Sequence, residues 1–191
     1  MNNPYLSSAS VYLISAISDL FLILVLLRFL LQLARADFYN PLCQFIVKVT
    51  NPALKPLRRV IPGWKGIDMS SLVLLLAVQA LALLLVNLAT GREIAVGALL
   101  VLSVGELLSL TLNCYLITIL AQVILSWVGP GGHHPVSALL YNLNEPVMRP
   151  ARRLLPPISG IDLSPIVVLF AIQLLKILVV APIIDVGRGL G

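Results

Sequence analysis

The chain has 191 residues, of which 59% are hydrophobic and only 11% are charged, and its mean hydropathy is +1.02. Soluble domains carry about 25% charged residues, so this composition excludes an ordinary soluble protein and predicts an integral membrane protein. The formal net charge of +5 does not indicate a nucleic-acid-binding protein, because the basic residues cluster in two short segments between apolar runs. There we expect them to set the topology and to contact lipid headgroups.

Four apolar stretches are long enough to cross a bilayer, which takes about 20 helical residues. We place the four spans at about residues 10–34, 69–89, 107–128 and 163–184. The apolar stretch around the third span begins earlier, and we interpret residues 94–105 either as an extension of that helix or as a short interfacial helix. We expect the tail after the fourth span to be free.

An internal duplication organises the chain. The segment NPALKPLRRVIPGWKGIDMS at residues 51–70 returns as EPVMRPARRLLPPISGIDLS at residues 145–164, at a constant offset of 94 residues without a gap. This divides the chain into a first repeat (1–93), a linker or helix extension (94–106) and a second repeat (107–191). The residues that recur, besides two arginine pairs, are Pro52, Pro56, Pro62, Gly66, Asp68 and Ser70 in the first copy and Pro146, Pro150, Pro156, Gly160, Asp162 and Ser164 in the second.

Each repeat contains two spans, so the chain returns to its starting side and the repeats are parallel. Both connecting loops then face one compartment, and they hold most of the lysines and arginines. The positive-inside rule therefore predicts cytoplasmic loops and periplasmic termini. The sequence predicts an all-α membrane protein with four transmembrane helices, arranged as two parallel helix–loop–helix repeats.

Each loop also carries a helix pattern of its own. Asn40 and Pro41 suit a helix start, and Leu42, Phe45, Ile46 and Val49 fall on one face. The second copy repeats this pattern after Pro135. We interpret it as a cytoplasmic amphipathic helix in the headgroup region, or alternatively as a helix that packs on the bundle.

The repeated segment after this helix is expected to turn repeatedly, because its three closely spaced prolines cannot continue a regular helix. Gly66 and Gly160 allow a backbone conformation that other residues resist. Asp68 and Asp162 stand where the N-cap of the next span should be, and there they can accept hydrogen bonds from free N–H groups.

Two arginine pairs recur at a fixed spacing from these aspartates, namely Arg58 and Arg59 in the first copy and Arg152 and Arg153 in the second. A guanidinium binds phosphate or carboxylate groups through paired hydrogen bonds. The arginines could bind lipid phosphates, a protein partner or the aspartates themselves, and the sequence leaves these alternatives open.

Both copies of the segment match the pattern P-x-x-x-P-x-R-R-x-x-P-x-x-x-G-I-D-x-S, and a glutamine follows in the next span, at Gln79 and Gln173. Over nearly its whole length the chain resembles the YggT family of bacterial inner-membrane proteins, which has YlmG relatives in Gram-positive bacteria and plastids. One departure is Ser71, which stands where the second copy has Pro165. The resemblance implies a location in the bacterial inner membrane and an association with osmotic or potassium stress tolerance. Relatives are associated with division-septum and nucleoid organisation, and a plastid relative with cytochrome assembly.

The chain shows no phosphate-binding loop, paired Cys-x-x-Cys, HExxH or nucleophile elbow. We therefore expect no enzyme activity, catalytic residue or cofactor. Adjacent His133 and His134 have no nearby Asp, Glu or Cys, so we expect solvated histidines and no metal site.

Five polar residues lie deep in the predicted spans, where such groups usually face the bundle interior or a water-filled path. They are Asp19, Gln79, Asn113, Gln173 and Lys176. Asp19 and Lys176 lie at similar depths, so we expect them to face each other or share a polar cavity, or alternatively to lie close enough to the external surface to be hydrated.

These features predict a non-enzymatic membrane organiser or assembly factor, linked to osmotic or ion stress tolerance or to cell-envelope and division organisation. Its arginine-rich loops would contact membrane lipids, a membrane-protein partner or a second copy of the chain, and no nucleic acid directly. The alternative function is a small ion transport or channel component, with potassium as the ion.

Overall fold

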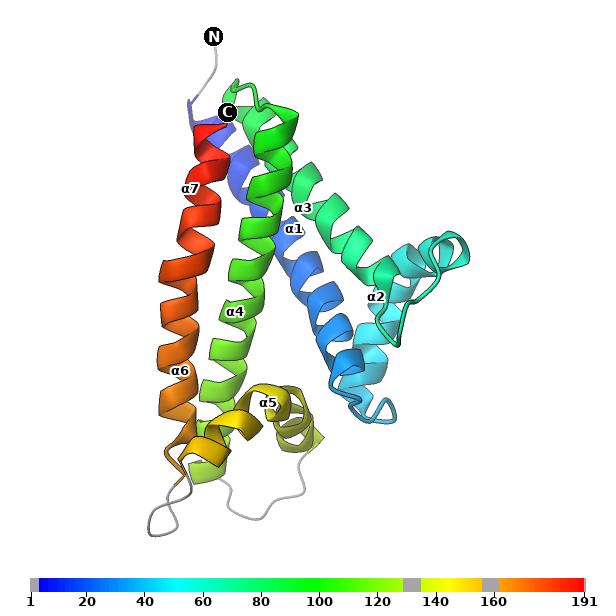
Figure 1. Cartoon of the computed structure of the whole chain (residues 1–191). Helices are drawn as coiled ribbons and strands as arrows, with labels where there is room; N and C mark the ends of the chain where they lie inside the picture. Colours follow the sequence, from blue (N-terminus) through cyan, green and yellow to red (C-terminus); the bar gives the residue numbers. More distant parts are fainter. Residues whose placement is uncertain (1–3, 129–134, 156–161, 191) are drawn as a thin grey trace.

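The computed structural model of the chain describes residues 4–128, 135–155 and 162–190, and these residues are almost entirely helical (Figure 1). The elements in chain order are α1 (Pro4–Leu33), α2 (Pro41–Val60), α3 (Met69–Thr90), α4 (Val96–Val128), α5 (Pro135–Leu154), α6 (Ser164–Leu175), the π-helical segment η1 (Lys176–Val180) and α7 (Ala181–Gly189). Within these ranges no β-strand forms, and an isolated backbone bridge joins Trp64 to Ile67.

Among the described residues, four helical stretches are long and apolar enough to cross a membrane, as the sequence predicted. They are Tyr5–Leu33, Met69–Thr90, Val96–Trp127 and Ser164–Gly189. Residues 96–105 continue directly into the third span, so of the two interpretations of this stretch the helix extension is correct. The fourth stretch runs to Gly189, and the prediction of a free tail was wrong. The apolar residues of the tail continue the helical pattern, and Gly187 packs against α4.

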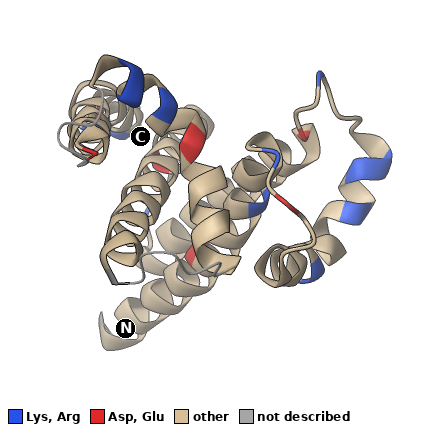
Figure 2. Cartoon of the chain, turned by 90° about the horizontal axis from the view of Figure 1, so that it is seen from below, with Lys and Arg blue, Asp and Glu red and all other residues tan. Residues whose placement is uncertain are grey.

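Both termini lie at one end of the molecule, and α2 and α5 lie toward the other (Figure 1). Seen from that other end, lysine and arginine residues line α2, the loop that follows it, and α5 (Figure 2). The basic loops of the two repeats are therefore on the same side of the four long helices.

The spans pack mainly within their own repeat, α1 against α3 and α4 against α6 and α7, and α3 against α4 joins the repeats. In the described part of the chain, α1 makes no contact with α6, η1 or α7. Glycines bring α4 and α7 close together. A Cβ at Gly105 would lie 2.8 Å from Ile184, and one at Gly187 would lie 2.8 Å from Leu102. Small residues permit such close approach between membrane helices.

The repeated prolines do not break the loop helices, and the prediction that this segment turns repeatedly was wrong. α2 runs through Pro52 and Pro56, and α5 runs through Pro146 and Pro150. In each helix the two prolines are four residues apart on one exposed face. Carbonyls on that face that lose an N–H partner can bond to water instead. Burial of the opposite face then maintains the helix.

The face of α2 that packs on the bundle is offset from the apolar stripe that the sequence indicated. It consists of Cys43, Ile46, Thr50 and Leu54. Of the four predicted apolar positions only Ile46 is buried, and Leu42, Phe45 and Val49 are 38–56% exposed. α2 therefore presents a second, outward apolar stripe beside the one that packs on α1 and α3.

Candidate functional site: the arginine–aspartate loops

A tight turn forms the tip of the first loop. Trp64 and Ile67 exchange two backbone hydrogen bonds of 3.1 and 2.9 Å, while Lys65 and Gly66 between them have φ values of 49° and 84°. Two consecutive left-handed residues are characteristic of a two-residue hairpin turn, and glycine adopts this conformation at no steric cost. Gly66 thus serves the backbone role that the sequence predicted, whereas Gly160 and Pro156 of the second loop lie outside the described residues.

Asp68 is the N-cap of α3 and holds this loop against α2. Its carboxylate accepts hydrogen bonds from the Ser71 hydroxyl (2.6 Å) and backbone N–H (3.4 Å), and from the Arg58 guanidinium (2.5 Å). The side chain is only 6% exposed. Burial alone would raise the pKa of Asp68, but the hydrogen bonds from Arg58 and Ser71 and the charge of Arg58 outweigh it and lower the pKa.

The second loop repeats the central contact with different support. Arg152 bonds to Asp162 (3.1 Å), as Arg58 does to Asp68, and also to Glu145 (2.6 Å). Asp162 accepts from the backbone N–H of Ser164 (2.9 Å) and is 38% exposed. Hydrogen bonds from Ser164 and Arg152 outweigh the effect of burial and lower the pKa of Asp162.

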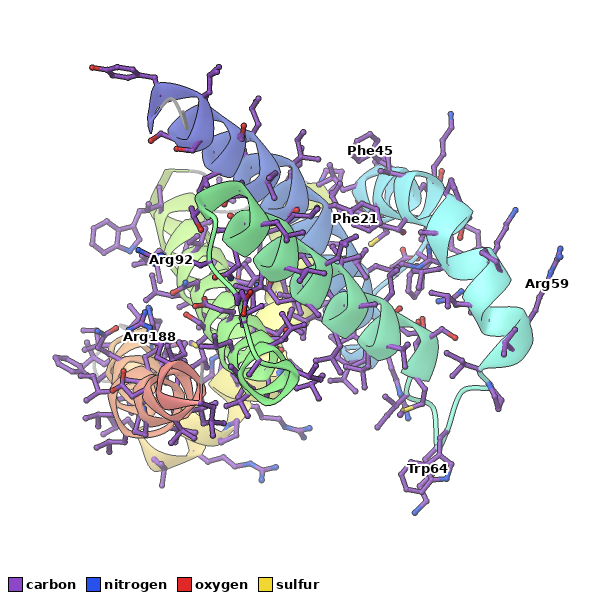
Figure 3. The ribbon with its side chains drawn as sticks, turned by 90° about the horizontal axis from the view of Figure 1, so that it is seen from above. Phe21, Phe45, Arg59, Trp64, Arg92 and Arg188 are labelled. Atoms are coloured by element: carbon purple, nitrogen blue, oxygen red, sulfur yellow. The ribbon has the colours of Figure 1, made fainter. Side chains whose placement is uncertain are left out.

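The two arginines of each pair therefore have different environments. Arg58 and Arg152 bind the aspartate that begins the next span. Arg59 and Arg153 are exposed, and within the described residues neither has a hydrogen-bond or ion-pair partner. Figure 3 shows Arg59 extending away from α2.

Trp64 extends outward from the tip of the first loop (Figure 3) and is 62% exposed. The Lys65 ammonium lies 4.8 Å from the centre of its ring. Tryptophan is enriched at membrane–water interfaces, where its apolar ring and polar N–H are both satisfied. The first loop thus projects an arginine, a lysine and an indole.

An open cavity of about 460 Å³ lies between the end of α1 and the first loop. Its lining residues are Gln32, Arg58, Ile61, Gly63, Gly66, Ile67 and Asp68. The Arg58 guanidinium also reaches the side-chain oxygen of Gln32 at 3.5 Å. The Arg58–Asp68 pair therefore forms one wall of a polar recess at the basic end of the molecule.

A second recurring contact, which sequence reasoning missed, joins the first helix of each repeat to its loop helix. Arg28 is 4% exposed and donates to the Thr50 hydroxyl (2.7 Å) and to the Val47 carbonyl (3.3 Å). At the same offset in the second repeat, the Asn144 side chain donates to Gln122 (2.8 Å). The sequence did carry a signal for this contact. Both positions are polar in both repeats, Arg28 and Thr50 in the first and Gln122 and Asn144 in the second.

The polar residues within the spans do not form the predicted ion pair. Lys176 donates to the Asn113 side chain (2.7 Å), and Asp19 is exposed on α1. Of the two alternatives for these residues, the one in which Asp19 faces Lys176 was wrong, because α1 and the fourth span do not meet in the described part of the chain. Gln79 is buried, whereas its counterpart Gln173 is exposed.

The described residues contain no group of three or more His, Cys, Asp or Glu side chains that could hold a metal ion. His133 and His134 lie outside the described ranges. Cys43 and Cys114 are free thiols.

Comparison with known proteins places these features in a family. The family model described as CCB3/YggT matches residues 7–89 and again residues 101–183, two ranges of equal length related by the offset of the duplicated segment. The chain belongs to the CCB3/YggT family. It is 44% identical over 177 residues to a Pseudomonas aeruginosa protein, covering 92% of this chain and 90% of that protein. It is 37% identical over 169 residues to YggT of Escherichia coli, covering 86% of each chain.

A Haemophilus influenzae protein is 37% identical over 170 residues, covering 88% of this chain and 90% of that relative. The names of these three relatives describe them as uncharacterized. No solved structure matches the chain.

Proposed function

We propose that this CCB3/YggT protein is a non-enzymatic, multi-pass protein of the bacterial inner membrane that acts as a membrane organiser or assembly factor. Its role is linked to osmotic or ion stress tolerance or to cell-envelope and division organisation. The arginine-rich loops lie in the cytoplasm and the termini in the periplasm. The positive-inside rule supports this orientation, because lysines and arginines line α2, α5 and the first loop (Figure 2).

The observation that carries the proposal is that each arginine pair consists of one side chain bound to a carboxylate and one that has no partner among the described residues. Arg58 and Arg152 are held by carboxylates, so their contribution is to fix the loop at the start of the next span. Arg59 and Arg153 are therefore next to a loop that these contacts fix in place. Their planar guanidinium groups can bind a headgroup phosphate or an acidic group of a partner through two parallel hydrogen bonds.

A complementation assay under osmotic stress tests this role. In a bacterial strain that lacks its own family member, we expect the Arg59→Ala, Arg153→Ala double variant to fail, while Arg92→Ala at the opposite end complements fully. The Arg59→Lys, Arg153→Lys variant keeps the charge but not the paired geometry, and we expect partial complementation. Full complementation by the double alanine variant would contradict the proposal.

Topology is checked separately, because an arginine variant could fail by inserting in the wrong orientation. Cysteines introduced at Lys65 and at Arg92 should be labelled from the cytoplasm and from the periplasm, respectively, in the wild-type background and in each variant. Labelling of both positions from one side would contradict the orientation.

Ion transport is the second candidate function, and one observation favours it. The fourth span changes to π-helix at Lys176, whose ammonium bonds to Asn113 of α4. π-helical turns occur often at functional sites, and polar residues within spans commonly mark ion paths. Potassium flux from purified protein in liposomes, abolished by Gln79→Leu with Gln173→Leu, would support transport in place of the organiser role.

A further inference from the structure

Asp19 places a carboxyl group on the outer surface of α1 within the membrane. It is exposed and lies midway along the span Tyr5–Leu33, about 21 Å from either end at a rise of about 1.5 Å per residue. The described residues give it no hydrogen-bond or ion-pair partner. An aspartate side chain is too short to reach the headgroups from this depth. An ionised side chain facing lipid at the bilayer centre is strongly unfavourable, so a polar partner from outside the chain is expected.

The fourth span offers the matching chemistry on a surface that is also uncovered. Gln173 is exposed on α6, and its side-chain amide can donate to a carboxylate. Lys176 lies one helical turn further along and is partly buried. Its ammonium donates to Asn113 of α4, and its positive charge close to this surface also attracts a carboxylate. In the first repeat the corresponding glutamine, Gln79, is buried.

The duplication shows how the two surfaces are related. Within the chain the repeats are joined by α3 against α4. By the repeat offset, α6 corresponds to α3, and α1 corresponds to α4. The equivalent contact is therefore α6 against α1, and within one chain these two helices do not touch.

The side chains on α1 agree with this correspondence. The α4 residues that pack against the buried cluster around α1 are Leu107, Leu110, Cys114 and Tyr115. Their counterparts on α1 are Leu13, Ala16 and Leu20, which are exposed, and Phe21, which is partly buried. Most of the face that joins the repeats in α4 is thus uncovered in α1, and Asp19 lies at its edge.

We propose that two copies of the chain pair within the membrane, with α1 of each copy against α6 of the other and Asp19 bonded to Gln173 of the partner copy. A two-fold axis forms both α1–α6 contacts at once, which gives a closed assembly of four repeats. This surface is separate from the arginine–aspartate loops, and the pairing does not depend on what those loops bind.

Subunit counting by single-molecule photobleaching in liposomes measures the dimer population. We expect wild-type protein to be dimeric and Asp19→Leu to raise the dimer dissociation constant about a hundredfold, the effect of losing two intramembrane hydrogen bonds of 1–2 kcal/mol each, one at each α1–α6 contact. The leucine removes a charge from the lipid-facing surface, so this variant should insert and fold normally. Asp185→Leu, the same change outside the proposed contact, should leave the dimer unchanged.

A double-mutant cycle tests the named pair. Asp19→Leu and Gln173→Leu should each weaken the dimer, and the combined variant should be no weaker than either alone, because each single change already removes the shared bond. Strictly additive losses, a monomeric wild-type protein, or a dimer unaffected by Asp19→Leu would overturn the proposal.

Disulfide cross-linking in native membranes locates the contact. In a background with Cys43→Ala and Cys114→Ala, one tagged chain carries Leu20→Cys and a differently tagged chain carries Gln173→Cys. We expect a cross-linked product with both tags. Leu20→Cys with Ile117→Cys, an exposed position on α4, should not cross-link. Equal cross-linking of the two pairs, or a product of Leu20→Cys with a different protein instead, would overturn the α1–α6 assignment.

Discussion

The two loops use the same arginine–aspartate contact but support it differently. In the first loop Asp68 is buried, caps α3 directly and receives two bonds from Ser71. In the second loop Pro165 replaces Ser71 and provides neither a hydroxyl nor an N–H. Asp162 is correspondingly more exposed, and its arginine is shared with Glu145, which occupies the position of Asn51. The arginine–aspartate pair is thus common to both loops, whereas the residues that support it differ between them.

The largest expected difference between the loops follows removal of the aspartate. Asp68→Ala leaves Arg58 without its carboxylate and removes the α3 cap, and we expect a loss of about 3 kcal/mol in the free energy of unfolding. Asp162→Ala should cost about 1 kcal/mol, because the pair is partly exposed and solvent screening weakens it. Equilibrium unfolding in detergent measures both values, and equal losses would show that the different support is irrelevant.

The two repeats also differ in the contact between their first helix and their loop helix, α1 with α2 and α4 with α5. Thr50→Val removes a hydrogen bond to a buried charged group, and we expect a loss of about 2 kcal/mol. Thr118→Val removes a bond between the neutral side chains of Thr118 and Asn144 and should cost about 1 kcal/mol. The same unfolding assay applies, and a larger loss for Thr118→Val would mean that the Arg28 charge is hydrated in the folded protein.

A smaller effect is expected when only the support is changed. Ser71→Ala keeps the backbone N–H but removes the hydroxyl bond to Asp68, at a cost of about 1 kcal/mol. Pro165→Ser introduces a hydroxyl and an N–H near Asp162 and should stabilise the second loop by a few tenths of a kcal/mol. Thermal melting of the two variants tests this, and destabilisation by Pro165→Ser would show that the proline is needed to start α6.

Acidification should have the smallest effect above pH 4. The folded-state pKa of Asp68 is lowered, so its contribution is fully present above the unfolded value of about 3.9 and is lost as pH falls through the folded pKa. The melting temperatures of wild type and Asp68→Asn should differ by a constant amount from pH 7 to about pH 4 and converge below it. Convergence already at pH 6 would contradict the lowered pKa.

The sequence predicted the spans well because bilayer thickness imposes a length of apolar helix that composition alone reveals. It also predicted the roles of Gly66 and Asp68, because each depends on neighbours within the same short segment. The course of the chain through Pro52 and Pro56 could not be predicted, because their local preference is outweighed by burial of the opposite face of α2. The partner of Lys176 depends on which helices meet, and local pattern carries no information on that.

The buried position of Arg28 has a consequence for the order in which the protein is made. Its partner Thr50 lies 22 residues later in the chain, so α1 leaves the ribosome and enters the bilayer before Thr50 can bind it. During that interval the guanidinium must stay hydrated at the membrane surface, and in the proposed orientation it helps to retain that end of α1 on the cytoplasmic side. When α2 folds against α1, the same charge becomes internal. In that orientation, one side chain acts first as an orientation signal during synthesis and afterwards joins two helices.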